Sequence, residues 1–165
     1  MNKLNEELIR RVKRLPNFYQ LELEPPRWLD EVWTPAILAL AGEPIEYLDG
    51  DWKEDDGKIS FTLIIFTKGR LIIETASGPA RYHITEPATI TLQARSRRPL
   101  LTLDIEGGYS YPLEDMSRWP GPVSCTAVYD HGSWAFPRPG ADGTQYQELV
   151  AFLPSLLGDL GSPSQ

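Results

Sequence analysis

Three arginines form the most concentrated positive charge of the sequence. Arg95, Arg97 and Arg98 lie within four consecutive positions of the chain. A guanidinium group offers several N–H donors in a planar fork, so arginines in a loop between strands can clamp a phosphate or a carboxylate. The sequence therefore predicts an anion-binding site at these three residues. The alternative is a soluble hairpin tip whose arginines pair with Asp104, Glu106 or an acidic hairpin.

A second group carries the residue types of nucleophilic catalysis. Asp130 and His131 are adjacent, and Ser133 and Cys125 lie close by in the sequence. Adjacent strand residues point to opposite faces, so Asp130 is poorly placed to orient His131, and no Gly-x-Ser-x-Gly elbow occurs. We interpret Asp130-His131-Gly132 as a hairpin turn and Cys125 as a small core residue. We therefore predict no catalytic residue.

An acidic stretch suggests calcium at first sight, because hard cations prefer clustered oxygen ligands. The stretch contains Asp49, Asp51, Glu54, Asp55 and Asp56. Its spacing does not match an EF-hand, because placing Gly57 at the sixth loop position puts Trp52 at the first. We expect a solvated hairpin rim, and neither a metal site nor a cofactor.

Composition indicates a single globular domain over residues 1–165, since 41% of the residues are hydrophobic and 24% are charged. One cysteine excludes an internal disulfide, and together with two histidines it is too sparse for a zinc framework. No apolar run approaches the roughly 20 residues that span a bilayer, and acids occupy the N-terminal segment. We expect a cytoplasmic protein without membrane insertion.

The charge is unevenly distributed. Lysine and arginine less aspartate and glutamate give 16 − 23 = −7, which disfavours binding to nucleic acid. Residues 46–56 hold six acids against one lysine, whereas residues 58–98 hold seven basic residues against two acids. Charge matching between neighbouring strands is the simpler interpretation, and a functional basic face is the alternative.

Two helices are expected in an N-terminal extension over residues 1–43. Leucine and valine recur at helical spacing from Leu4 to Leu15, and Pro16 ends that helix. A second helix is expected from Pro35 to Ala41. The segment between them, Phe18 to Trp33, lacks a clear period and is expected to be an extended arm with a short helical turn near its end.

Residues 44–136 have the alternation and turn residues of antiparallel strands. Asp55-Asp56-Gly57 predicts a hairpin, and Ser77-Gly78-Pro79 is expected to turn the chain into a strand at Arg81 to Thr85. With the strand at Arg81 to Thr85, the following runs give eight candidates for the expected strands, about seven in number, and the last of them is short: Ile45 to Glu54, Lys58 to Thr67, Arg70 to Ala76, Ala88 to Ala94, Leu101 to Ile105, Val123 to Tyr129 and Ser133 to Phe136.

An amphipathic helix is expected over residues 142–160. Leu149, Leu153 and Leu156 belong to its apolar stripe, and Asp142 or Thr144 can cap its start. Pro154 lies inside this stripe and is expected to kink or break the helix near Phe152, because proline lacks the N–H donor.

The order of these elements resembles the pleckstrin-homology-like superfold, in which about seven hairpin-connected strands form a barrel and a C-terminal helix plugs one end. The resemblance covers about Ile45 to Leu160 and implies an α+β, mainly β fold. A lipocalin-like barrel or an α+β roll is the alternative. Members of the superfold bind lipid headgroups, peptides or proteins, and the acidic first hairpin speaks against phosphoinositide binding.

We therefore expect a non-enzymatic binding module that recognises a protein or a small anionic ligand. The alternative is a small-molecule enzyme or carrier with a pocket inside the barrel, in which His83 or His131 works with a nearby carboxylate. A pocket that holds a histidine and a carboxylate would favour this alternative.

Overall fold

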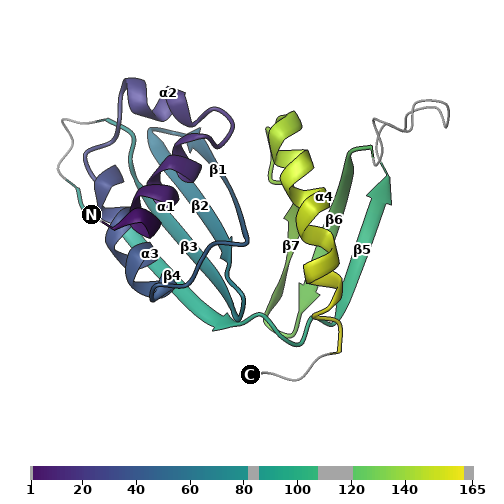
Figure 1. Ribbon diagram of the computed structural model, residues 1–165. Helices are drawn as coiled ribbons and strands as arrows, with labels where there is room; N and C mark the ends of the chain where they lie inside the picture. Colours follow the sequence, from purple (N-terminus) through teal and green to yellow (C-terminus); the bar gives the residue numbers. More distant parts are fainter. Residues whose placement is uncertain (1, 82–85, 108–120, 162–165) are drawn as a thin grey trace. The chain divides into compact units, whose positions relative to one another are not determined.

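The computed structural model describes residues 2–81, 86–107 and 121–161 (Figure 1). The chain divides into two compact units, Met1–Arg95 and Ser96–Gln165. The single-domain expectation for residues 1–165 stays a prediction. None of the helices in the described ranges combines the length and the apolar character needed to span a bilayer.

Four helical segments begin the first unit: α1 (Lys3–Lys13), α2 (Phe18–Leu23), the 3-10 helix η1 (Leu29–Val32) and α3 (Trp33–Leu40). The Asn2 side chain caps α1 by accepting the Asn5 N–H at 2.9 Å. The expected extended arm is wrong, because α2 occupies its first part. Phe18 and Leu21 are buried there, so tertiary packing holds a helix that has too little periodicity to be recognised locally.

Four strands form the sheet of the first unit in the order β1-β2-β3-β4. They are β1 (Tyr47–Asp55), β2 (Lys58–Phe66), β3 (Arg70–Pro79) and β4 (Thr89–Ser96). The β1/β2 and β2/β3 pairs are antiparallel. Asp55 lies opposite Lys58, and the turn residues Asp56 and Gly57 have φ values of 51° and 76°, which confirms the predicted Asp-Gly hairpin.

The core of the first unit lies between its helices and one face of this sheet. Leucines and other apolar side chains at alternate strand positions supply the sheet side. The fully or almost fully buried members include Leu8, Val12, Phe18, Ala36, Leu40, Leu48, Phe61, Leu63, Ile65 and Ile72.

The turn expected at Ser77-Gly78-Pro79 is wrong, because β3 continues through these residues. Gly78 lies opposite Ile59 in the β2/β3 register. A Cβ atom at Gly78 would lie 2.5 Å from Trp28 Nε1. The indole of Trp28 packs there and donates from Nε1 to the Pro79 carbonyl at 2.9 Å. Gly78 therefore allows the indole to pack closely against the strand. The strand expected next, at Arg81 to Thr85, falls mainly on residues 82–85, which lie outside the described residues.

The second unit contains β5 (Thr102–Gly107), β6 (Val123–Tyr129), β7 (Gly132–Phe136) and α4 (Gly143–Leu157). The strands form an antiparallel sheet in the order β5-β6-β7. Asp130 and His131 make the tight turn between β6 and β7, as predicted, because Tyr129 pairs with Gly132.

Helix α4 contacts β6 and covers the buried side chains of that strand. Asp142 caps it by accepting the Gln145 N–H at 3.0 Å, which confirms the predicted start. Of the kink or break expected near Phe152, the break is wrong, because the helix continues past Pro154 to Leu157, and the kink stays a prediction. A proline removes one backbone donor, and the buried Leu149, Phe152 and Leu156 hold the helix on the sheet.

The expected α+β, mainly β class with antiparallel sheets is confirmed. The expected seven-stranded barrel is not, because the seven strands in the described ranges form two separate sheets of four and three strands and no closed barrel. Turn residues predict which consecutive strands pair. Closure of a sheet into a barrel depends on pairing between strands that are far apart in the sequence.

Candidate functional site

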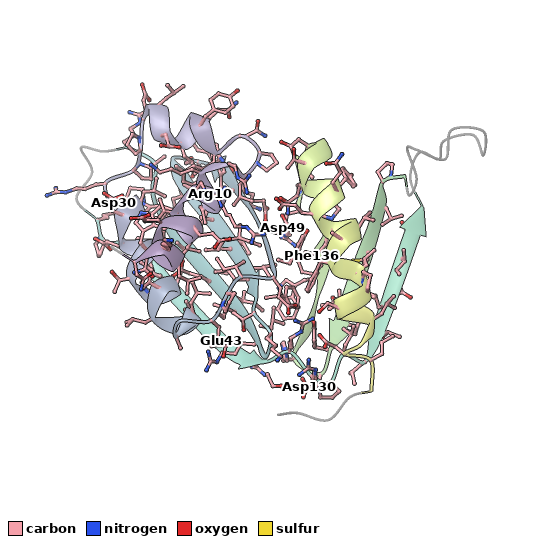
Figure 2. All side chains as sticks on the ribbon, viewed as in Figure 1. Arg10, Asp30, Glu43, Asp49, Asp130 and Phe136 are labelled. Carbon is pink, nitrogen blue, oxygen red and sulfur yellow. The ribbon has the colours of Figure 1, made fainter. Side chains whose placement is uncertain are left out.

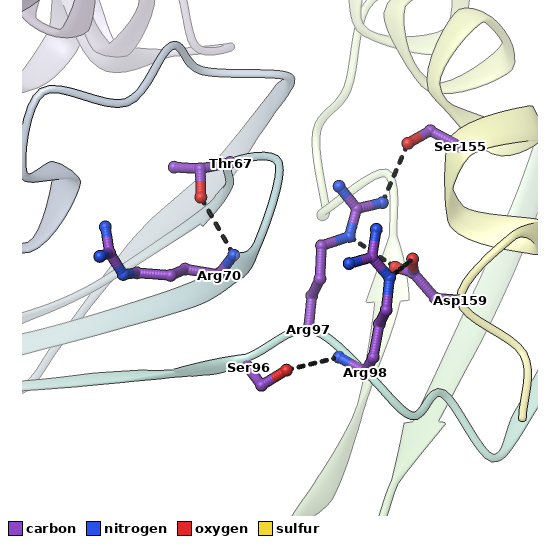
Figure 3. Close-up of polar contacts among 7 residues, drawn as sticks. All are labelled: Thr67, Arg70, Ser96, Arg97, Arg98, Ser155 and Asp159. Atoms are coloured by element: carbon purple, nitrogen blue, oxygen red, sulfur yellow. Dashed lines mark hydrogen bonds and ion pairs between the residues drawn. The ribbon is translucent and has the colours of Figure 1, made fainter. Parts of the chain in front are cut away.

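Arg97 is buried in the second unit, where its guanidinium contacts Asp159 (Figure 3). Its Nε donates to Asp159 Oδ2 at 2.5 Å, and its Nη2 donates to Ser155 Oγ at 3.1 Å. The guanidinium carbon also lies 5.2 Å from the centre of the Phe152 ring, within the range of a cation–π contact. Helix α4 therefore supplies an aromatic face to this arginine, and the segment directly after the helix supplies a carboxylate.

The other two arginines of the predicted anion site occupy different surroundings. Arg98 Nε donates to Asp159 Oδ1 at 3.1 Å, so one carboxylate accepts from two guanidinium groups. Arg95 is exposed at the end of β4 and belongs to the first unit. The partners considered for these arginines in the sequence, Asp104 and Glu106, are exposed on β5. The anionic group that Arg97 and Arg98 contact is the Asp159 carboxylate of the same chain. Binding of a separate phosphate or carboxylate ligand stays a prediction.

Tyr129 lies close enough to this cluster to respond to its charges. Its hydroxyl is buried and has no hydrogen-bond partner in the described structure. Burial raises the pKa of Tyr129 above its usual range, the negative charge of Asp159 raises this pKa further, and Arg97 opposes that effect. The Tyr129 hydroxyl is therefore neutral and is a poor nucleophile or base at physiological pH.

The residues considered for nucleophilic catalysis are placed in an aromatic cluster and a strand. The His131 ring stacks on Tyr129 with centroids 5.2 Å apart, and it also packs against Trp134 at 5.2 Å. Cys125 is buried on the face of β6 that it shares with Ala127, as expected. His83 lies outside the described residues.

The acidic stretch is only partly a solvated rim. Glu54, Asp55 and Asp56 are exposed, whereas Asp49 on β1, labelled in Figure 2, is buried. The Tyr47 hydroxyl and the Gly50 N–H each donate to the Asp49 carboxylate at 2.8 Å. The part of the chain that the structure describes contains no cluster of three or more histidine, cysteine or acidic side chains arranged to hold a metal ion.

Glu74 is a second buried carboxyl group that the sequence analysis did not single out. It lies on β3 opposite Leu63, on the same strand face as Ile72 and Ala76 of the helix-covered core. Its side chain is fully buried, and neither carboxyl oxygen has a partner among the described residues. Burial raises the pKa of Glu74 to about 8, so the group is mostly protonated at neutral pH.

A groove of about 640 Å³ lies in the first unit between α2 and the hairpin end of β1 and β2; we call it the α2 groove. One wall consists of the end of α2 and the residues after it. The other wall belongs to the sheet face that the helices cover along the rest of the sheet. The lining residues are Gln20, Leu21, Glu24, Pro25, Trp52, Glu54, Ile59, Ala80 and Arg81.

The α2 groove has an apolar floor and a charged rim. Leu21 and Ile59 are buried members of the core, and the half-buried Trp52 presents an aromatic side chain. Trp52 is held by its Nε1, which donates to the Asn17 carbonyl at 3.3 Å. Two exposed carboxylates, Glu24 and Glu54, and one exposed guanidinium, Arg81, complete the rim.

The rim charges of the α2 groove are not paired with one another or with other described residues. Neither Glu24 nor Glu54 nor Arg81 forms a hydrogen bond or an ion pair with another residue that the structure describes. One signal for this groove is present in the sequence, namely the alternation that places Trp52 and Glu54 on one strand face. No sequence pattern indicates that Leu21 and Arg81 lie at the same face.

Comparison of the chain with protein-family models, with curated proteins and with solved structures finds no match. The assignment of function therefore rests on the geometry of the described residues.

Proposed function

We propose that this protein is a non-enzymatic binding module that takes a positively charged side chain of a protein partner in the α2 groove. The observation that carries the proposal is the combination of an aromatic wall, Trp52, with two carboxylates, Glu24 and Glu54, above an apolar floor. A guanidinium or ammonium group gains from the face of an aromatic ring and from charge-assisted hydrogen bonds.

The apolar floor suits the rest of such a side chain. Lysine and arginine have aliphatic stems that pack on apolar surface while the charged end stays near water. Leu21 and Ile59 offer that surface beneath the rim. Arg81 reduces the rim to a net charge of −1, and the net charge of −7 for the chain favours the approach of a cationic partner.

The fold expectation supports a binding role as well. Seven strands followed by a helix are the element order of the pleckstrin-homology-like superfold, and we retain that superfold and a cytoplasmic location as part of the proposal. A fold by itself does not assign a function. The alternative of a small-molecule enzyme or carrier needs a histidine in the pocket, and no histidine is among the described residues that line the α2 groove, whereas His83 lies outside the described part of the chain.

The test is a nuclear magnetic resonance titration with N-acetyl-arginine amide and with its citrulline analogue, which has the same shape without the charge. We expect the arginine compound to shift the Trp52 indole N–H resonance, and the citrulline compound to bind about tenfold more weakly, which corresponds to about 1.4 kcal/mol.

Two double variants locate the effect. Glu24→Gln with Glu54→Gln should remove the preference for arginine, whereas Glu6→Gln with Glu31→Gln makes the same charge change at exposed acids elsewhere and should keep it. Equal binding of the two compounds, or the same loss in both double variants, would contradict the proposal.

A further inference from the structure

Strand β5 is an edge of the second sheet and is almost entirely exposed. Within the described part of this unit, β5 pairs with β6 alone. Every residue from Thr102 to Gly107 is exposed except Leu103, which is half-buried. A strand in this position presents backbone N–H and C=O groups along its free side and is a template for pairing with another strand.

The two faces of β5 differ in chemistry. Leu103 and Ile105 lie opposite Ala127 and Cys125, on the face that is buried in β6. Ile105 is nevertheless 46% exposed, and Leu101, at the same alternation, is 55% exposed. Asp104 and Glu106 alternate with them on the opposite face, and neither forms an ion pair with another described residue.

The exposed apolar face continues onto the end of α4. Leu157 is 45% exposed and Leu160 is 41% exposed. Leu160 forms a parallel bridge with Leu100, directly before β5, so the end of α4 and the start of β5 are neighbours (Figure 1). Large apolar side chains exposed together beside a free strand edge mark an interaction surface.

A second copy of the chain is a poor occupant of this edge. In antiparallel pairing about a two-fold axis, opposite residues share a face, so the two Asp104 and Glu106 pairs would lie opposite or diagonal to one another. Like charges at those positions destabilise strand pairing. The charge of β5 instead favours a strand that carries positive charge.

We propose that β5 is a docking edge for an extended segment of a partner protein in which lysine or arginine alternates with apolar side chains. The backbone of the segment pairs with the free side of β5. Its basic side chains lie beside Asp104 and Glu106, which are two positions apart on one face, and its apolar side chains cover Ile105 and the end of α4. This surface is independent of the α2 groove, since each lies within its own unit.

The test uses two capped synthetic peptides, one that alternates lysine with valine and one that alternates glutamate with valine. We expect the lysine peptide to slow amide hydrogen exchange along β5 and to bind about tenfold more tightly than the glutamate peptide. Two cross-strand pairs of opposite charge with the lysine peptide, and two of like charge with the glutamate peptide, account for that ratio.

Charge reversal on β5 should invert the preference. In Asp104→Lys with Glu106→Lys, the glutamate peptide should become the tighter ligand, and unchanged amide resonances of β6 and β7 would show that the sheet is intact. The control, Glu6→Lys with Glu31→Lys, makes the same charge change at exposed acids of the first unit and should leave the preference for lysine unchanged.

Three results would overturn the proposal: no protection of the β5 amides by the lysine peptide, protection without a charge preference, or self-association of the chain through β5. None of them bears on the arginine titration of the α2 groove, so the two proposals fail separately.

Discussion

Arg97 and Asp159, 62 positions apart in the chain, form an ion pair in which each side chain is 1% exposed. The backbone reinforces this contact, because the Leu100 N–H donates to the Asp159 carbonyl at 2.9 Å and the Gly161 N–H donates to the Leu100 carbonyl at 3.1 Å. The cluster fastens the segment that enters β5 to the end of α4. Its first role in the molecule is therefore structural.

Replacing Asp159 with asparagine should destabilise the protein by about 3 to 5 kcal/mol, because Arg97 would remain buried without an opposite charge. Chemical denaturation followed by far-ultraviolet circular dichroism measures the change. Asp130→Asn, which neutralises an exposed acid of the same unit, should change the free energy of unfolding by no more than about 0.5 kcal/mol. Equal stability of the two variants would contradict the structural role of the pair.

Glu74 should make stability fall as the pH rises. Its pKa is about 8 in the folded protein and 4.5 as an ordinary exposed group. Between these pH values the folded state therefore keeps a proton that the unfolded state loses. The free energy of unfolding falls by up to about 1.4 kcal/mol for each pH unit of increase in this range. The contribution of the protonated Glu74 side chain to stability is fully present below pH 4.5 and is lost once the pH passes about 8.

The check is to compare Glu74→Met with the native chain across this pH range. Methionine is apolar and similar in length, so the variant should lose the pH-dependent term and should be the more stable protein at the alkaline end. A matched control, Glu31→Gln, removes an exposed acid and should keep the pH dependence of the native chain. Parallel stability curves for Glu74→Met and the native chain would contradict burial of the carboxyl group.

Gly78→Ala should destabilise the first unit by roughly 1 to 3 kcal/mol, as expected for overpacking. The new Cβ would lie 2.5 Å from Trp28 Nε1 and 2.9 Å from Ala88 Cβ. The indole has to move, which breaks its hydrogen bond to the Pro79 carbonyl. Thermal unfolding gives the stability, and the Trp28 indole N–H resonance reports the movement. Gly69→Ala, with no atom within 4 Å of its Cβ, is the control and should leave both unchanged.

Leu149→Ala should cost about 2 to 5 kcal/mol, because this side chain of α4 is fully buried. The paired variant Leu157→Ala removes the same atoms from a side chain of α4 that is 45% exposed, and its cost should be much smaller. Urea unfolding of both variants gives the comparison. A similar loss in both would show that α4 buries a different face.

Local sequence patterns determined most of the strands of this chain and the start of α4. The Asp56-Gly57 turn and the Asp142 cap follow from the chemistry of one or two residues, since positive φ and an N-terminal hydrogen bond are local requirements. Strand alternation likewise placed Cys125 with its buried neighbours. Such features depend on contacts between residues that are close in the chain.

Tertiary structure alone decided the partners of the predicted site and the location of the candidate groove. Arg97 meets Asp159 across 62 positions, and Leu21 meets Trp52 and Arg81 only when α2 covers the end of the sheet. Tertiary contacts also override local signals. The sequence predicts a turn at Gly78, but Trp28 packs against this glycine and β3 continues through it. A sequence pattern fixes the face on which a side chain lies, whereas distant packing determines what that face meets.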